Sequence, residues 1–332
     1  MRYYNIPIFV PHYGCPHDCV FCNQKHITGE TQDVTAERVK DIINEHLSTV
    51  KSENSRIEAA FFGGSFTAID KDKQTELLEA AYSFVKEGRI SGIRLSTRPD
   101  CIDDDIVERL VAYGVTAIEL GVQSLDDDVL LASGRGHKSE AVKNAVNTIR
   151  KYPVELGLQM MTGLPGDTPQ KSINTCKKII ELKPDCVRIY PTLVIKDTAL
   201  EKLYRDAKYT PQSLDDAVSL VSQLMVLFRK NKIRVIRAGL AATDEISYGA
   251  SLVAGPFHAA FGELAEGEIF YNRICEYMKN ESSMEFLINP RDISKAIGNG
   301  KRNIKRFENQ GKKVTFKVCE GIDIGDILPV KG

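Results

Sequence analysis

Short runs of β-branched and aromatic residues alternate with amphipathic segments along most of the chain. The runs of strand character cover residues 6–10, 57–62, 92–96, 117–121, 155–161 and 186–190. Hydrophobic positions that repeat with the period of an α-helix lie between them, at 35–48, 73–86, 104–113, 140–151 and 170–182. This alternation predicts six strand–helix units and is typical of a parallel sheet built from βαβ repeats.

Six units are too few for a complete eight-unit barrel, so the pattern predicts a partial (β/α)6 barrel of the α/β class. A hydrophobic helix at 214–230 and a strand at 233–236 are expected to close its side. We assign residues 1–240 to the barrel with this extension and residues 241–284 to a connecting segment, with a linker at 279–284. A small α+β module is expected at 285–332.

Composition narrows the class of protein. The chain has 332 residues, 42% of them hydrophobic, and a formal net charge of -1, which excludes a disordered chain. No apolar stretch is long enough to span a membrane. The first residues, with a short apolar run broken by Pro7, lack the features of a secretory signal. We therefore expect a cytoplasmic protein with no membrane partner.

Three of the eight cysteines, Cys15, Cys19 and Cys22, form a C-x3-C-x2-C motif after the first predicted strand. Zinc sites usually have four ligands in two pairs, and a histidine at position 12, 17 or 26 would be needed to complete one here. Three thiolates also suit a [4Fe–4S] cluster in which one iron has no protein ligand. That iron can bind a small molecule through an amine and a carboxylate, and the cluster can then deliver one electron to it.

The cysteine motif, with Phe21 before its last cysteine, is similar to the signature of radical S-adenosylmethionine (SAM) enzymes. The resemblance implies that the three cysteines hold the cluster and that SAM chelates the fourth iron. Reductive cleavage of SAM then yields methionine and a 5′-deoxyadenosyl radical. It also implies a partner that donates the electron, such as flavodoxin or ferredoxin.

Further motifs end the predicted strands, where active sites of barrel folds gather. In the family a Gly-Gly-Glu-like motif contacts the methionyl amino group through its backbone. This chain has Gly63 and Gly64 followed by Ser65, so only the backbone role carries over. Relatives often carry a ribose-binding Glu where Ser96 stands.

Three polar residues complete the cofactor set that the resemblance implies. Gln123 matches a polar residue near the ligand, although a structural glutamine is an equal alternative. Arg135 would pair with the SAM carboxylate, and Gln159 stands where some relatives have a ribose-binding Asp. The predicted cofactor-binding residues are thus Phe21, Gly63, Gly64, Ser96, Gln123, Arg135 and Gln159. No catalytic residue is assigned; His258 is a candidate proton donor or a structural residue.

The stretches 96–100, 119–124, 135–137 and 190–195 are similar to the radical SAM domain of the catalytic subunit of Elongator. The likeness spans roughly residues 5–240. That subunit modifies wobble uridines of tRNA with a carboxymethyl group derived from acetyl-CoA, and it carries an acetyltransferase-like domain. We do not expect that domain within these 332 residues, so the resemblance implies radical chemistry more strongly than the acetyl-CoA reaction.

The C-terminal segment 291–318 carries nine Lys or Arg residues against two acids, Asp292 and Glu308. Two short helices, with Ile297, Ile304 and Phe307 on one apolar face, flank a glycine turn at 298–301, and a strand follows at 313–318. This pattern resembles a degenerate KH module, whose Gly-x-x-Gly turn clamps a nucleotide backbone. The predicted RNA-binding residues are Lys295, Gly298, Gly300, Lys301, Arg302 and Lys305. An ordinary solvated basic face remains an alternative.

Together these features predict a radical SAM enzyme that acts on RNA, with tRNA as the expected partner. Two alternatives stay open. The same chemistry can act on a small molecule, with a purely structural basic module, or the chain can be an iron–sulfur RNA-binding protein without turnover.

Overall fold

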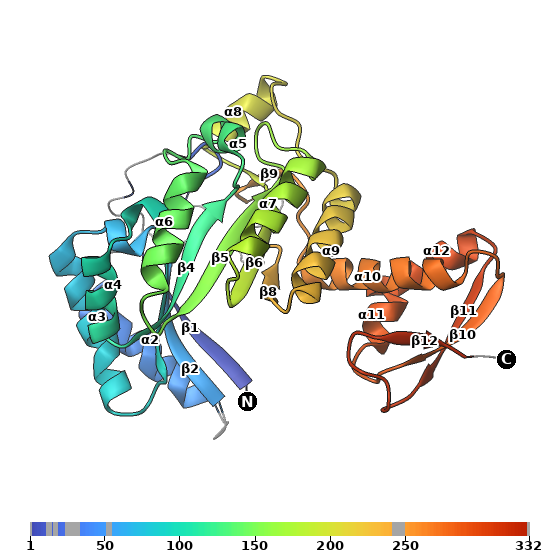
Figure 1. The fold of residues 1–332 in the computed structure, drawn as a ribbon, viewed down its shortest axis with the longest axis horizontal. Coiled ribbons are helices and arrows are strands. Elements are labelled where there is room, and N and C mark those ends of the chain that lie inside the picture. The colour runs from blue at the N-terminus through green and yellow to red at the C-terminus, as the bar shows by residue number, and fades with distance from the viewer. Residues whose placement is uncertain are drawn as a thin grey trace.

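The computed structural model describes residues 2–10, 15, 19–23, 34–50, 55–240 and 250–330. Within these ranges the chain forms a large α/β part and a small C-terminal module, joined by one helix (Figure 1). None of the helices in the described ranges combines the length and the apolar composition that a membrane crossing requires.

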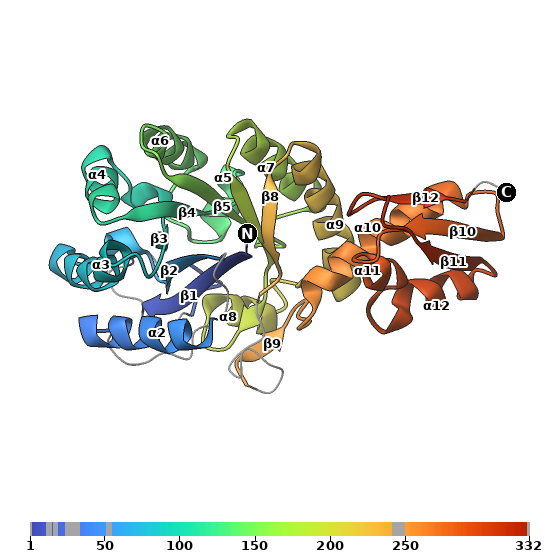
Figure 2. The same ribbon diagram turned by 90° about the horizontal axis from the view of Figure 1, so that it is seen from below.

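The large part is built on a parallel sheet of seven strands in the order β1-β2-β3-β4-β5-β6-β8. The strands are β1 (Arg2–Val10), β2 (Ser55–Gly63), β3 (Gly92–Thr97), β4 (Val115–Gln123), β5 (Glu155–Thr162), β6 (Cys186–Pro191) and β8 (Arg234–Ala238). Viewed from below, the sheet curls into part of a ring with helices outside it (Figure 2). The predicted partial barrel is confirmed, and the predicted closing strand is β8.

Six helices cover the outer face of this sheet. They are α2 (Ala36–Thr49), α3 (Lys71–Lys86), α4 (Asp104–Ala112), α6 (Ser139–Ile149), α7 (Pro169–Glu181) and α9 (Leu214–Lys230). Side chains at their first turns fix where several begin: Asp70 and Asp103, for example, accept hydrogen bonds from backbone N–H groups of α3 and α4. The observed bounds lie within a few residues of the predicted ones.

Alternate side chains of each strand point to opposite faces of the sheet. In β4, Ile118 and Leu120 belong to the hydrophobic core under the helices. Glu119, Gly121 and Gln123 therefore point to the inside of the curled sheet. This alternation places polar side chains, rather than a second apolar layer, inside the partial barrel.

Several short elements were not predicted. They are η1 (Phe66–Ala68), η2 (Pro99–Cys101), α5 (Asp127–Ala132), β7 (Val194–Ile195), α8 (Ala199–Arg205) and β9 (Leu252–Ala254). Most of them follow the C-terminal ends of the strands, and α5 and α8 lie at the top of Figure 1.

A long helix, α10 (Phe261–Tyr277), lies in the segment that was expected only to connect the two parts. It packs on α9 at one end and contributes Phe270 and Ile274 to the core of the module at the other. Because α10 is buried on several sides, it has no wide polar face, and the amphipathic pattern that reveals a helix is weak.

The module contains β10 (Ser283–Ile288), α11 (Ile293–Ile297), η3 (Asn299–Lys301), α12 (Arg302–Asn309), β11 (Lys313–Val318) and β12 (Ile327–Pro329). β10 lies between β11, which is parallel to it, and β12, which is antiparallel. The two helices and the strand at 313–318 are as predicted. That the module is KH-like stays a prediction, as do the domain boundaries.

Two details of the module differ from the prediction. The expected linker at 279–284 is too long, because β10 begins at Ser283 and pairs with β11 from that residue. Ile297 and Ile304 are only half-buried, whereas Ala296 and Asn303 are buried together with Phe307. Asn303 takes a core position because its amide donates to the carbonyls of Gly267 and Ala296.

Candidate functional site

A cavity of about 140 Å³ lies at the C-terminal ends of β2 to β5. All three predicted cysteines and all seven residues of the predicted cofactor set line it: Cys15, Cys19, Cys22, Phe21, Gly63, Gly64, Ser96, Gln123, Arg135 and Gln159. The structure adds Ser65, Thr97, Arg98 and Gly121 to the lining. A larger cavity of about 540 Å³, between the 163–169 loop and α9, contains no cysteine.

Backbone hydrogen bonds hold the cysteine segment in place. Val20 donates to the carbonyl of Ser133 (3.0 Å) at the end of α5, and Leu200 in the first turn of α8 donates to the carbonyl of Val20 (2.7 Å). Cys22 donates to the carbonyl of Cys19 (3.0 Å). The positions 12, 17 and 26 that a zinc site would need lie outside the described residues.

In the described part of the chain, no three Cys, His, Asp or Glu side chains form a group that could hold one metal ion. An iron–sulfur cubane makes a different demand, because each thiolate binds a separate iron atom and the sulfur ligands stand farther apart.

The backbone conformation explains why glycines follow β2. Gly63 has φ +113°, and a Cβ at this position would lie 2.5 Å from the carbonyl oxygen of Val10. The N–H of Gly64 donates to the same oxygen (3.2 Å). The glycines therefore let the ends of β1 and β2 meet, and they leave a cavity wall of bare backbone that a ligand can approach closely.

Ser65 stands where the family motif has an acid, and here it joins two strand ends. Its hydroxyl is 2.8 Å from the Thr97 hydroxyl and accepts from the backbone N–H of Arg98 (3.1 Å). Thr67 adds a 2.6 Å contact to Thr97. These buried contacts fix the loop after β2 against the end of β3, next to Ser96.

Gln123 and Arg135 form the next part of the wall. Gln123 has φ +63° at a register shift between β4 and β5, and its Oε1 is buried without a partner among the described residues. Such irregularities re-aim a side chain toward a site. Arg135 donates from Nη2 to the carbonyl of Gly121 (2.5 Å) and from Nη1 to Cys19 Sγ (3.5 Å). The guanidinium predicted to bind a carboxylate thus lies against a cysteine.

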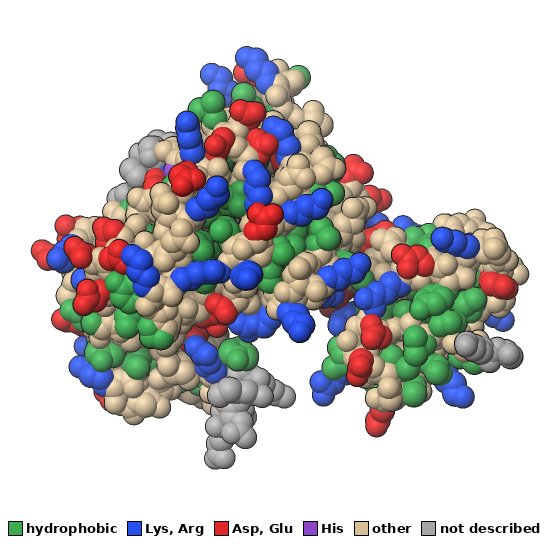
Figure 3. Space-filling view, in the orientation of Figure 1, with side chains coloured by type: hydrophobic (Ala, Val, Ile, Leu, Met, Phe, Trp, Pro, Cys, Tyr) green, Lys and Arg blue, Asp and Glu red, His purple; other side chains and the backbone are tan. Residues whose placement is uncertain are grey.

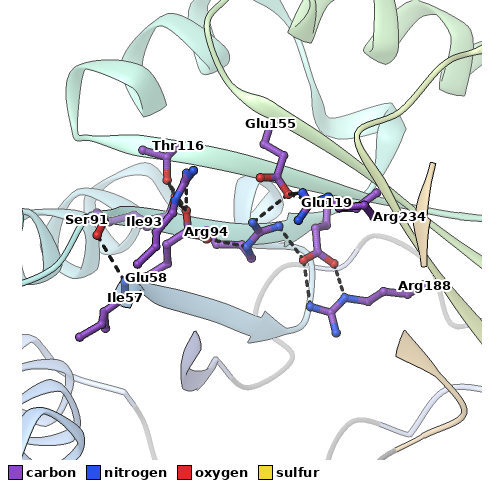
Figure 4. Close-up of polar contacts among 12 residues, drawn as sticks. Ile57, Glu58, Ser91, Ile93, Arg94, Thr116, Glu119, Glu155, Arg188 and Arg234 are labelled. Carbon is purple, nitrogen blue, oxygen red and sulfur yellow. Dashed lines mark hydrogen bonds and ion pairs between the residues drawn. The ribbon is translucent and has the colours of Figure 1, made fainter. Parts of the chain in front are cut away.

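Below this wall the inside of the sheet holds a layer of buried ion pairs (Figure 4). Arg94 contacts Glu58, Glu119 and Glu155 at 2.9, 3.2 and 3.0 Å. Arg188 forms two hydrogen bonds with Glu119, at 2.6 and 3.0 Å. Burial raises the pKa of Glu119, but the hydrogen bonds from Arg188 and Gln159 and the charges of Arg188 and Arg94 together lower the pKa below its ordinary value. Glu119 is therefore a charged carboxylate.

A second cluster of polar residues lies after the ends of β3 and α5. Arg98 forms two hydrogen bonds with Asp100, at 2.9 and 2.8 Å, and donates to the carbonyl of Arg135 at 2.7 Å. Burial and the charge of Arg135 lower the pKa of His137 to about 4, so this histidine is neutral at pH 7. Its Nδ1 lies 3.1 Å from the carbonyl of Lys138. His258 lines neither this group nor the cysteine cavity; its Nδ1 accepts from the N–H of Ala260.

The predicted RNA-binding residues lie within 295–305, on α11, η3 and α12 of the C-terminal module (Figure 1), and none of them lines the cysteine cavity. Gly298, Gly300 and Lys301 all have positive φ values, +81°, +58° and +62°, so the turn is tight. Lys295 pairs with Asp292 (2.7 Å) and Arg302 with Asp215 of α9 (2.7 Å). Lys301 and Lys305 are exposed.

Side chains of Lys and Arg lie on both sides of the hollow between the α/β part and the module (Figure 3). The positive charge of Arg306 is not free to bind a ligand. Its guanidinium pairs with Glu268 (2.5 Å) and lies 3.4 Å from the centre of the Tyr271 ring. The positive charge of the segment 291–318 is thus only partly available to a ligand.

Comparison with known proteins gives two family matches. The model of the radical SAM superfamily matches residues 9–179, which is just over half of the chain. The model of the radical SAM C-terminal domain matches residues 184–270. The second match extends past residue 240 and includes most of α10.

Two similar proteins are longer than this chain. A tRNA uridine(34) acetyltransferase of Dehalococcoides mccartyi is 28% identical over 192 residues, 52% of this chain and 42% of that protein. Human Elongator complex protein 3 is 28% identical over 203 residues, 55% of this chain and 37% of that protein. The chain thus spans about two fifths of the length of these relatives.

Among solved structures, Elp3 of the archaeon Methanocaldococcus infernus has a similar fold. The TM-score is 0.64 at 22% identity, over 85% of this chain and 64% of that one. The resemblance to the Elongator catalytic subunit is therefore confirmed in sequence and in fold.

Proposed function

This chain belongs to the radical SAM superfamily, and from that premise we propose that it is an enzyme that modifies tRNA. Members of the superfamily use a [4Fe–4S] cluster and SAM. We further propose which residues hold the cluster and SAM, and which part of the chain binds RNA.

The chemistry of the cavity suits a cluster held by Cys15, Cys19 and Cys22. Their three thiols reach one cavity, and the buried guanidinium groups of Arg98 and Arg135 line the same space. Cysteine binds metal through its thiolate sulfur, and the nearby guanidinium groups can offset the negative charge of a thiolate-bound cluster. We propose these three cysteines as the cluster ligands.

The cavity wall also offers groups that match SAM. Gly63 and Gly64 expose backbone that can receive the methionyl amino group. Arg135 has a buried Nε without a partner among the described residues, available to a carboxylate. Gln123 and Gln159 present side-chain amides to the same space, and Phe21 and Ser96 complete its lining.

When bound, the cluster supplies one electron to SAM, whose cleavage gives a 5′-deoxyadenosyl radical. The chain's own residues orient the cofactor and hold it against the end of the sheet. The planar guanidinium of Arg135 suits a two-point contact with a carboxylate. The reductant is proposed to be a small electron carrier of the flavodoxin or ferredoxin type.

RNA as the substrate is proposed on two grounds. Two of the relatives named above are a tRNA uridine(34) acetyltransferase and Elongator complex protein 3. The module at 285–332 presents exposed lysines, among them Lys301 and Lys305, beside a tight glycine turn. We propose that it positions the polynucleotide, while the part at 1–240 carries out the radical step and 241–284 links the two.

One observation carries the proposal. Residues from Cys15 to Gln159, contributed by six segments of the chain, meet in one cavity at the C-terminal end of the sheet. A purely structural explanation gives no reason for three thiols, two buried guanidinium groups and two amides to converge there.

The enzymatic part is tested by anaerobic reconstitution with iron and sulfide, followed by dithionite and SAM. We expect 5′-deoxyadenosine and methionine in equal amounts. Cys15→Ala abolishes the product, whereas Cys319→Ala, which changes a half-buried cysteine of the module, leaves it unchanged. Reconstituted protein without 5′-deoxyadenosine formation would leave only the non-catalytic iron–sulfur alternative.

The substrate is tested separately, by comparing tRNA nucleosides by mass between cells with and without this protein. We expect one modified nucleoside to disappear in the deletion strain and to return with the wild-type chain but not with Cys15→Ala. Identical nucleoside profiles would favour a small-molecule substrate.

A further inference from the structure

Two arginines are buried beside the cysteines, and one carboxylate, that of Asp100, pairs with Arg98. The exposed fractions of Arg98 and Arg135 are 2% and 6%. Arg98 uses Nε and Nη2 on Asp100, and the same Nη2 donates to the backbone carbonyl of Arg135. Both guanidinium groups line the cavity that contains Cys15 and Cys19.

The charges of this group do not cancel within the described residues. Burial raises the pKa of Asp100, but the opposing effects, chiefly the hydrogen bond and the charge of Arg98, are larger in sum. The pKa is therefore lowered overall, and Asp100 is charged. His137, with a pKa of about 4, is neutral, and burial raises the pKa of the Cys101 thiol, which is neutral too. Two guanidinium charges against one carboxylate leave one positive charge.

The same arginines also have unused donors. Arg98 Nη1 and Arg135 Nε are buried and have no hydrogen-bond partner among the described residues. A buried donor without a partner costs on the order of 1–3 kcal/mol, and an unpaired buried charge costs more. Such a group implies an anionic partner in the cavity, and Arg98, unlike Arg135, has no role in the proposed SAM site.

A [4Fe–4S] cubane held by three thiolates is an anion that fits this position beside Arg98. Its total charge is one negative unit when the core is oxidised and two after one electron enters. Hydrogen bonds to the sulfurs and nearby charge set the potential of such clusters. We propose that Arg98 compensates the negative charge of the cluster and thereby raises its reduction potential.

The step involves an electron only. A low-potential one-electron donor is oxidised, the cluster is reduced, and no covalent bond of the chain is made or broken. Arg98 keeps its proton throughout. Burial works against the charged form, but the hydrogen bond and the charge of Asp100 raise the pKa of Arg98 above its ordinary value.

The test is a redox titration of the reconstituted full chain with dithionite, followed by electron paramagnetic resonance, without SAM or RNA. Arg98→Gln removes the charge. At a fixed potential we expect the reduced-to-oxidised ratio to fall at least about tenfold, a shift of about 59 mV to lower potential. Arg98→Lys keeps the charge and should lie much closer to the wild type.

Asp100→Asn should shift the midpoint potential in the direction opposite to Arg98→Gln. It removes the carboxylate that pairs with Arg98, so the net positive charge rises and the midpoint should move to higher potential. A merely structural role of this ion pair predicts no such opposition between the two variants. Arg109→Gln is the matched control: Arg109 also has a buried Nη1 without a partner among the described residues, but it lies on α4 outside the cavity.

Each outcome of the redox titration either supports or overturns the role of Arg98. Arg98→Gln with full iron content and the wild-type midpoint overturns the inference, as do shifts of the same sign in Arg98→Gln and Asp100→Asn. If Arg98→Gln fails to take up iron, Asp100→Asn decides alone: a higher midpoint supports the inference, and an unchanged or lower one overturns it. The inference rests on the proposed cluster site but not on RNA. Wild-type chain that binds no cluster refutes that site instead.

Discussion

Gln159 donates its side-chain amide to the buried carboxylate of Glu119, with 2.9 Å between Nε2 and Oε2. A charged carboxylate only accepts hydrogen bonds, so the amide nitrogen of Gln159 has to face it. The carbonyl oxygen Oε1 is then the group that Gln159 offers to the cavity. In this way a glutamine presents the same kind of acceptor as the aspartate that some relatives have at this position.

The first prediction concerns this acceptor. Gln159→Leu removes it from the cavity and leaves Glu119 short of one donor. We expect SAM binding to the reconstituted protein to weaken about tenfold, which corresponds to about 1.4 kcal/mol, a usual value for one lost hydrogen bond. Equilibrium titration with SAM measures it.

Gln159→Glu gives a sharper version of the same test. A second carboxyl would then lie against Glu119, and two carboxylates in contact raise one of their pKa values. SAM binding by this variant should depend on pH near neutrality, whereas binding by the wild type should not. A flat pH profile for Gln159→Glu would show that the two side chains are not in contact.

The second prediction concerns the stability that the charged layer gives to the sheet. Glu119→Ala leaves Arg94 and Arg188 buried with one acceptor fewer. Removing one partner of a buried ion pair costs about 3–5 kcal/mol. We expect a loss of this size in the free energy of unfolding, measured with urea.

The matched control for Glu119→Ala is Glu140→Ala. Glu140 pairs with Lys143 on the surface at 3.5 Å, and both side chains are more than half exposed. Such pairs contribute about 0–1 kcal/mol. A loss at Glu119 no larger than the loss at Glu140 would mean that the interior pairs do not stabilise the fold.

The sequence allowed much of the frame of the site to be predicted. The cysteine motif and the polar residues that end β2 to β5 were found because each is a local pattern, and the structure brings them to one cavity. The Glu119–Arg188 pair was not found, because it depends on the register between strands. Arg98 was visible as part of a motif, but no local pattern shows that its guanidinium lies beside a cysteine.

The third prediction concerns the dependence of stability on pH. His137 has a folded pKa of about 4, below its ordinary value of 6.5, because burial and Arg135 disfavour its charged form. The unfolded chain therefore binds a proton first as the pH falls, and the fold loses stability between pH 6.5 and 4. His137→Gln should reduce this loss in urea unfolding at pH 7 and 5. Equal losses in both proteins would contradict it.

The fourth prediction separates the lysines of the C-terminal module that are free to bind RNA from its structural arginine. Lys301 and Lys305 are exposed, whereas Arg306 is held by Glu268 and the Tyr271 ring. Lys301→Ala with Lys305→Ala should weaken tRNA binding and lower the slope of log affinity against log salt by about 1.4 to 1.8, since each phosphate contact contributes about 0.7 on a single strand and about 0.9 on duplex DNA. Thermal unfolding should stay unchanged.

Arg306→Ala should do the opposite. It removes an ion pair and a cation–π contact from the core of the module, so thermal stability should fall while the salt slope stays close to that of the wild type. Filter binding of tRNA across a series of salt concentrations, with melting curves of the same samples, measures both effects. If the lysine pair leaves the slope unchanged, the turn at 298–301 does not contact phosphates, and the module has a structural role only.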